Sequence, residues 1–253
     1  MNSNEFKRVP AVDKCFAILE LLAQSKKPMG ISDISGKLNL NKSTVYNISH
    51  TLIDLNVLEN QSNGKFTFGT RFYVLANMVG KRSTFIQIAH PYLEEINKKT
   101  NLSTFLGLRS DCHAILIDKV DSDHGIKVSS EIGMQMPILA GAGIKAMLSQ
   151  LSDDAIDEIL ARTELKRYTP LSIIDKELYK EEIHEVRRQG IAYDIGEYIE
   201  GMVGFAVPIK AYGRDVQAAI WAAGLRSQVS DSSLPWLKSL LINFSEEINC
   251  RLQ

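Results

Sequence analysis

Cysteine is scarce in this chain, which has only Cys15, Cys112 and Cys250 among its 253 residues. An odd number of widely separated cysteines argues against a disulfide framework, and we expect reduced thiols. Long apolar runs are also missing, since no stretch approaches the roughly 18 residues needed to span a bilayer. The N-terminal sequence MNSNEFKRVP lacks the apolar core of a signal peptide. We therefore expect a cytoplasmic protein that does not enter the membrane.

Net charge is nearly absent too, at −1, but the two signs are unevenly placed. Residues 1–82 hold 11 Lys and Arg against 6 Asp and Glu, a balance of +5, whereas the remainder holds 18 against 24, a balance of −6. A basic first third is typical of a DNA-binding head, because phosphate neutralisation supplies most non-specific affinity. A balance of +5 is modest, so it favours a dimer in which two heads combine their fields.

Two short helices joined by a tight turn are predicted between Ile31 and Asn60. Ser32 can cap the first helix, Asn39 and Leu40 form the turn, and Asn41 can cap the second. Apolar residues at helical spacing give each helix one face to bury. These are Ile34 and Leu38 in the first helix, and Val45, Ile48, Leu52 and Leu55 in the second.

The opposite face of the second helix is rich in hydroxyl and amide groups and carries no acid before Asp54. Such a face suits hydrogen bonding to phosphates and base edges, although any amphipathic helix pair shows a similar spacing. The hypothesis is a helix-turn-helix that binds double-stranded DNA. Its candidate DNA-binding residues are Ser32, Lys42, Ser43, Thr44, Tyr46, Asn47, His50 and Lys65.

A hairpin is predicted directly after this helix, with extended runs at Val57–Leu58 and Lys65–Phe68 around Asn63–Gly64. A hairpin in this position is a wing. Lys65 on its rim either contacts a phosphate or is a solvated turn lysine. Upstream, Pro10 opens a helix that ends near Ser25–Pro28 and whose recurring apolar residues are Val12, Phe16, Leu19 and Leu22.

The length and the 45% hydrophobic content allow two modest domains. An apolar helix over Phe72–Val79, ending at Lys81–Arg82, is too apolar to stand alone in water, so it is predicted to connect the domains and contact its twin in a dimer. The predicted division is a winged helix-turn-helix over residues 1–68, a linker helix over 69–82 and a second domain over 83–253.

The second domain alternates helical and extended patterns, which predicts an α+β fold with a mostly antiparallel sheet and segregated helices. Turns are expected at Arg109–Cys112 and Tyr212–Arg214. Strands are expected at 103–108, 113–120, 203–209 and 216–222. Helices are expected at 85–97, from near Gly143, at 153–162, at 176–189 ending at Gly190, and at the C-terminus with Leu237, Leu240, Leu241, Phe244 and Ile248 on one face.

The chain resembles the IclR family of bacterial transcriptional regulators over essentially its full length. The resemblance lies in RVPAVDKCFAILELLAQ, NKSTVY, the wing NGKFTFG, EIGMQMPILAGAG, and the spaced residues Gly190, Ala192, Asp194, Glu197, Gly201, Ala206 and Pro208. It implies a winged helix-turn-helix joined to a GAF-like effector-binding domain. It also implies homodimers or homotetramers on palindromic operators upstream of catabolic genes. By motif, the implied effector-binding residues are Gly141, Ala142, Asp194, Met202, Gly204, Trp221 and Ala223.

The glycine-rich turn Gly141–Gly143 has a physical case of its own, because a turn that feeds a helix exposes backbone amides to an anion. The sequence departs from small-acid-binding relatives by having Gly204, Trp221 and Ala223 where they carry a cysteine and two serines. A pocket with an aromatic wall and fewer hydrogen-bond donors favours an aromatic or bulky organic acid over a small keto acid. Alternatively, Trp221 plugs the cavity. A further departure is Ile144, where relatives usually have lysine, with Lys145 one place later.

Other chemistry fits less well. The stretch Gly141–Ala146 formally matches a dinucleotide fingerprint but lacks the surrounding βαβ unit. No cofactor or metal ion and no catalytic residue is expected. Two alternatives stay open, namely a GAF-like enzyme or sensory module that uses Cys112 without specific DNA binding, and a head that docks protein partners.

Overall fold

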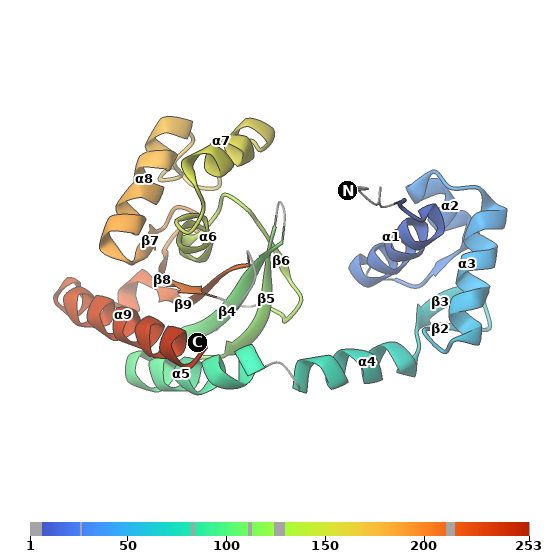
Figure 1. Cartoon of the computed structure of the whole chain (residues 1–253), viewed down its shortest axis with the longest axis horizontal. Coiled ribbons are helices and arrows are strands. Elements are labelled where there is room, and N and C mark those ends of the chain that lie inside the picture. Colours follow the sequence, from blue (N-terminus) through green and yellow to red (C-terminus); the bar gives the residue numbers. More distant parts are fainter. Residues whose placement is uncertain are drawn as a thin grey trace, which may run out of the picture. The chain divides into compact units, whose positions relative to one another are not determined.

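The computed structural model describes residues 7–25, 27–81, 84–110, 113–123, 130–210 and 216–252. The chain forms two compact units, Met1–Arg82 and Ser83–Gln253 (Figure 1). The expected turn at Tyr212–Arg214 lies outside the described residues, as do Asp111 and Cys112 of the expected turn at Arg109–Cys112, while Arg109 and Ser110 belong to a strand. The finer division of the first unit at residue 68 stays a prediction.

The core of the first unit includes a fully buried apolar residue from each of its first three helices. Ile18, Ile34 and Val45 are fully buried and belong to one hydrophobic cluster. Burial of such side chains contributes about 1.5–3 kcal/mol each, so this cluster fixes how the helices pack. The helices are α1 (Pro10–Gln24), α2 (Ile31–Leu38) and α3 (Lys42–Asp54).

The predicted apolar face of α1 is only partly correct. Leu19 and Leu22 are buried as expected, but Val12 is 53% exposed and Phe16 is 58% exposed. In α3, Leu55 follows the last helical residue and is 43% exposed, so its predicted burial is wrong. The outer part of α1 therefore presents an apolar surface that the first unit does not cover.

The turn between α2 and α3 forms where the sequence predicts it, with Asn39 in the left-handed conformation at φ 51°. Asn41 is the N-cap residue of α3, but its side chain makes no capping hydrogen bond. Ser32 is not a cap, contrary to expectation, because strand pairing holds Gly30 extended and the helix begins at Ile31. The carboxylate of Asp33 accepts the N–H of Gly30 at 3.0 Å in its place.

The wing is a small antiparallel sheet in the order β1-β3-β2. Gly64 turns the hairpin at φ 71°, and the side chain of Asn63 accepts the backbone N–H of Lys65 at 3.1 Å. The hairpin is confirmed, whereas the two-residue strand that joins its far edge was missed. The strands are β1 (Met29–Gly30), β2 (Leu58–Asn60) and β3 (Lys65–Phe68).

Gly69 closes the wing, and its N–H donates to the carbonyl of Val57 at 2.8 Å. A Cβ atom at this position would lie 2.5 Å from the carbonyl oxygen of Asn56. We therefore expect Gly69→Ala to lower the free energy of unfolding by about 1–3 kcal/mol, as overpacking does. Urea denaturation measures this, with Gly36→Ala as the control, because nothing lies within 4 Å of the Cβ position in that exposed turn of α2. Equal stability of the two variants would contradict the prediction.

Helix α4 (Thr70–Lys81) follows the wing and is the predicted linker helix. Its described apolar side chains are largely exposed. An amphipathic helix with exposed apolar residues has surface left for a partner. The exposed residues are Phe72, Tyr73, Val74, Leu75 and Met78.

The second unit is built on a six-stranded sheet in the order β6-β5-β4-β9-β8-β7. Every pair of neighbouring strands is antiparallel, which confirms the expected sheet and leaves no βαβ unit around Gly141. The short strands β6 and β7 were missed. The strands are β4 (Ser103–Ser110), β5 (His113–Val120), β6 (Gln135–Pro137), β7 (Ala192–Ile195), β8 (Met202–Lys210) and β9 (Gln217–Leu225).

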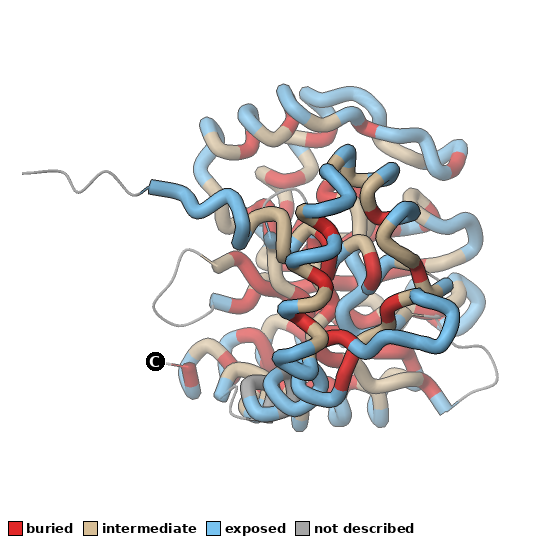
Figure 2. Tube along the Cα trace, turned by 90° about the vertical axis from the view of Figure 1, so that its right-hand side faces the viewer, coloured by how far each residue is buried: buried red, intermediate tan, exposed pale blue. Residues whose placement is uncertain are grey.

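Helices cover both faces of this sheet (Figure 1). On one face lie α5 (Thr84–Thr100) and α9 (Leu234–Arg251), the latter preceded by the 3-10 turns η1 (Arg226–Gln228) and η2 (Asp231–Ser233). On the other lie α6 (Ala142–Leu148), α7 (Asp153–Arg162) and α8 (Lys176–Gln189). Along α5, α7, α8 and α9 buried positions recur between exposed ones (Figure 2), whereas every residue of α6 is buried. No helix among the described residues is long and apolar enough to cross a membrane.

Alternation along β9 decides which side chains reach α6. Ile220 and Ala222 pack into the core on the α5 and α9 side, while Trp221 belongs to the core on the α6 side. Successive side chains of a strand point to opposite faces, so Trp221 and Ala223 share a face. The register pairs Gly204 of β8 with Ala223, which brings three predicted effector residues together.

Candidate DNA-binding surface and effector cavity

The outer face of α3 is open to solvent. Lys42, Ser43, Tyr46 and Asn47 are exposed, and Thr44 and His50 are half-buried. The rings of Tyr46 and His50 stack at 4.1 Å between centroids, tilted by 35°. This contact places the two rings side by side on the outer face of α3.

The remaining predicted DNA-binding residues, Ser32 and Lys65, lie in α2 and in strand β3 of the wing. Ser32 is exposed in the first turn of α2, and Lys65 is half-buried at the start of β3. Lys42 is the first residue of α3, beside backbone N–H groups that attract anions. The phosphate contacts of Lys42 and Lys65 stay predictions.

The second unit contains a cavity of about 350 Å³ between the sheet and α6. All seven residues carried over from the family resemblance line it, and the volume lies in the range of small-molecule sites. Sequence reasoning did not find the residues that other elements bring to the same wall. These are Phe105, Ser130, Met134, Met136, Ala140, Ile144, Tyr198, Ile199 and Val203, and the cavity is also lined by Gly143 of the predicted glycine-rich turn.

Trp221 forms an aromatic wall of the cavity. Its indole packs so tightly between two glycines that a Cβ on Gly107 would lie 2.9 Å from the ring and one on Gly143 3.0 Å. The ring also stacks on Phe105 at 5.4 Å between centroids, with an interplanar angle of 23°. The cavity remains open beside this stack, so the indole is a wall and not a plug.

Asp194 is the charged residue of the cavity lining among the described residues. Its Oδ1 accepts the N–H of Glu197 at 2.7 Å and that of Tyr198 at 3.4 Å. Burial raises the pKa of Asp194, although these two N–H groups and the charge of Lys145 act against the shift. The other oxygen lies toward Gly141, where a Cβ would be 3.8 Å from Oδ2. It is free to accept a hydrogen bond from a hydroxyl group in the cavity.

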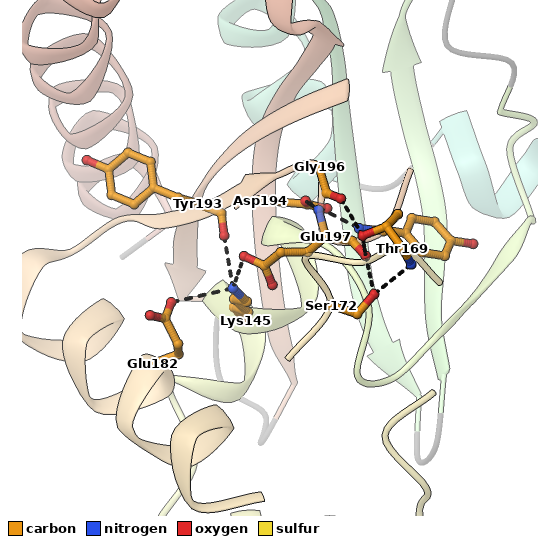
Figure 3. A network of polar contacts seen from close by, with 9 residues as sticks. Lys145, Thr169, Ser172, Glu182, Tyr193, Asp194, Gly196 and Glu197 are labelled. Atoms are coloured by element: carbon orange, nitrogen blue, oxygen red, sulfur yellow. Dashed lines mark hydrogen bonds and ion pairs between the residues drawn. The ribbon is translucent and has the colours of Figure 1, made fainter. Parts of the chain in front are cut away.

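Lys145 is 1% exposed and does not line the cavity. Its Nζ donates to Glu197 Oε1 at 2.7 Å, to the carbonyl of Tyr193 at 3.1 Å and to Glu182 Oε2 at 3.4 Å (Figure 3). Ile144, one residue earlier, lines the cavity. The departure at Ile144 therefore places an apolar side chain in the wall and the ammonium group in a polar network.

His90 and His184, which the sequence favours as a cap and a surface residue and not as bases, both have acidic partners. His90 Nδ1 lies 2.7 Å from Asp118 Oδ2, and His184 Nε2 lies 3.2 Å from Asp153 Oδ1. Across the described part of the chain, no three His, Cys, Asp or Glu residues gather as metal ligands would. Neither histidine lies in the cavity lining.

Two family models match the chain. The model described as "IclR helix-turn-helix domain" matches residues 11–62, and the one described as "Bacterial transcriptional regulator IclR C-terminal" matches residues 78–250. Among curated proteins, the HTH-type transcriptional regulator XynR of Escherichia coli is 26% identical, covering 95% of this chain and 93% of its own length. The transcriptional repressor IclR of E. coli is 23% identical, covering 95% and 89%.

Solved structures share the fold. An IclR regulator from Alicyclobacillus acidocaldarius has a TM-score of 0.86 at 22% identity, covering 98% of this chain and 100% of its own. An IclR homolog from Microbacterium hydrocarbonoxydans, crystallised in complex with 4-hydroxybenzoate, has a TM-score of 0.81 at 20% identity, covering 96% and 98%. The families and relatives are regulators and not enzymes, which leaves the enzyme alternative without support. The chain belongs to the IclR family of bacterial transcriptional regulators, with a helix-turn-helix DNA-binding domain followed by an α+β effector domain.

Proposed function

We propose that this cytoplasmic regulator binds a palindromic operator in double-stranded DNA through α3 and the wing, as a homodimer or homotetramer, and controls catabolic genes. The open, acid-poor face of α3 supports the DNA contact. The exposed apolar residues of α1 and α4 support pairing, because such surfaces on a soluble protein mark interaction sites. A palindrome then mirrors the two-fold symmetry of the pair.

The proposed effector is an aromatic or otherwise bulky organic acid. The observation that carries this proposal is the stack of Trp221 on Phe105 beside an open cavity of about 350 Å³. A flat ring gains contact area on such a wall, whereas a two- or three-carbon acid covers little of it. The homolog crystallised with 4-hydroxybenzoate adds support from a protein of the same fold.

Calorimetric titration with a panel of acids tests this effector class. We expect binding heat with hydroxylated benzoates and none with pyruvate or glyoxylate. A ligand present at 100 times its dissociation constant should also stabilise the protein by about 2.7 kcal/mol in thermal unfolding. Heat with pyruvate or glyoxylate, together with none from any aromatic acid, would overturn the proposal.

Effector binding is proposed to change operator affinity. A coupling free energy of about 1–3 kcal/mol suffices for regulation and must be reciprocal. The operator should therefore change effector affinity by the same factor as the effector changes operator affinity. Measuring both sides of this cycle tests the coupling, and unequal factors at equilibrium would point to a further species in the mixture or to separate binding events.

A further inference from the structure

Lys145 is the buried cation of the second unit's polar network. An ammonium group that leaves water is costly unless it is paired and hydrogen-bonded. At 1% exposure, its Nζ meets the carboxylate of Glu197, that of Glu182 and the carbonyl of Tyr193 (Figure 3). The shortest of these contacts is the one to Glu197, at 2.7 Å. Lys145 itself is not part of the cavity lining.

Glu197 lies in the segment between β7 and β8 and is held at three points. Its side chain meets Lys145, its N–H donates to Asp194 Oδ1 at 2.7 Å, and its carbonyl accepts the hydroxyl of Ser172 at 2.7 Å. The hydroxyl of Thr169 also donates to the carbonyl of Gly196 at 2.7 Å (Figure 3). A segment cross-linked in this way has little freedom at Glu197.

The two residues after Glu197 enter the cavity wall. Tyr198 and Ile199 both line the cavity, and the Tyr198 ring packs edge-on against Tyr168 at 4.9 Å between centroids. Their position depends on where the backbone of Glu197 is fixed. The contact of Lys145 with Glu197 therefore ties α6, whose first residues line the cavity, to the segment that carries Tyr198 and Ile199.

We propose that Lys145 is a positioning residue of the effector site, which holds Tyr198 and Ile199 in the cavity wall through its ion pair with Glu197. It sets effector affinity without touching the effector. The effect of Lys145 on effector affinity rests on the proposed function of the cavity. The positioning of Tyr198 and Ile199 does not, because it is a property of the protein without ligand.

Removing the ammonium group of Lys145 should leave the Glu197 carboxylate without a cation, and the cavity wall at Tyr198 should then lose its fixed position. In Lys145→Met, the Glu197 carboxylate, only 21% exposed, remains near Asp194 without its cation. Burial raises the pKa of Glu197, and the charge of Lys145 acts against that shift. An uncompensated carboxylate moves toward water and carries Tyr198 with it. Adding Glu197→Gln removes that charge, so the double variant should regain much of the wall's order.

Amide hydrogen exchange on the ligand-free full chain tests the positioning role. We expect the N–H groups of Glu197 and Tyr198 to exchange roughly 10- to 100-fold faster in Lys145→Met, the factor that a lost charge-assisted hydrogen bond represents. The double variant Lys145→Met/Glu197→Gln should lie close to wild type. Lys180→Met is the matched control. Lys180 of α8 also forms an ion pair, with Asp157 of α7 at 2.6 Å, but it does not line the cavity. This variant should leave both amides unchanged.

Unchanged amide exchange in Lys145→Met would overturn the proposal. Exchange in the double variant as fast as in Lys145→Met would also overturn it, because the cause would then be lost packing and not the unpaired Glu197 carboxylate. If Lys145→Met fails to fold, Glu197→Gln alone serves, since it keeps the shape and weakens the same contact. Calorimetry with 4-hydroxybenzoate then addresses affinity, with an expected loss of about tenfold or more in Lys145→Met. Wild type that binds no 4-hydroxybenzoate counts against the effector class, while the exchange result still decides the positioning role.

Discussion

A variant with alanine at both Lys42 and Tyr46 is expected to lose specific binding to its operator. Lys42 supplies an ammonium group at the N-terminal end of α3, and Tyr46 supplies an exposed hydroxyl one turn later. A charged phosphate contact and a base-edge contact together are worth about 3 kcal/mol or more, which is on the order of 100-fold in affinity. Gel shifts with DNA from beside the protein's own gene measure this loss.

Two further variants separate the contributions. Lys42→Ala alone should reduce the slope of log affinity against log salt by about one phosphate contact. Tyr46→Phe keeps the ring on His50 and removes only the hydroxyl. Lys176→Ala is the charge-matched control, because Lys176 is exposed on α8 in the other unit and should leave binding unchanged. Full binding by the double variant would favour a head that docks protein partners.

Gly204→Leu is expected to abolish effector binding. The backbone of β8 accepts a side chain at this position, and a Cβ there would lie 3.5 Å from Ala142 Cβ and 3.7 Å from Asp194 Cβ, both ordinary contacts. A leucine side chain would extend from that point into the cavity, where it competes with the ligand for space. Because the leucine side chain occupies the space that the ligand needs, the dissociation constant of the ligand should rise by about 100-fold or more.

Gly204→Ala is the graded control, since its methyl group fits without displacing a neighbour. It should bind the acid that binds wild type with an affinity reduced only a few-fold. Calorimetry measures affinity, and thermal unfolding without ligand verifies that both variants fold. If Gly204→Leu bound the acid as wild type does, the cavity beside Trp221 would not be the effector site.

The effector domain shows which elements local sequence can specify. Helices α7 and α8 begin and end where predicted because their signals are local. The side chains of Ser152 and Asp175 cap them, and Gly190 ends α8 in the left-handed conformation at φ 74°. Strands β6 and β7 were missed because three or four residues carry no readable alternation. Such strands exist only through pairing with a longer neighbour.

The cavity shows the same division. Motif resemblance located Trp221 and Gly204, but not Phe105, which reaches Trp221 only because β4 lies beside β9 in the sheet. Tyr198 was missed for a similar reason, since the polar contacts of Glu197 bring it to the cavity wall. Neither partner is close in sequence to the residue that positions it.

By itself the sequence determined the family, the helix-turn-helix with its wing, the ends of α7 and α8 and the antiparallel character of the second unit's sheet. These follow from caps, glycines and apolar spacing, which act over a few residues. Only the tertiary structure decided that Lys145 pairs with Glu197, that Val12 and Phe16 of α1 stay exposed, and that a cavity remains beside the indole. Those outcomes depend on contacts between distant segments, whose packing and burial no local pattern encodes.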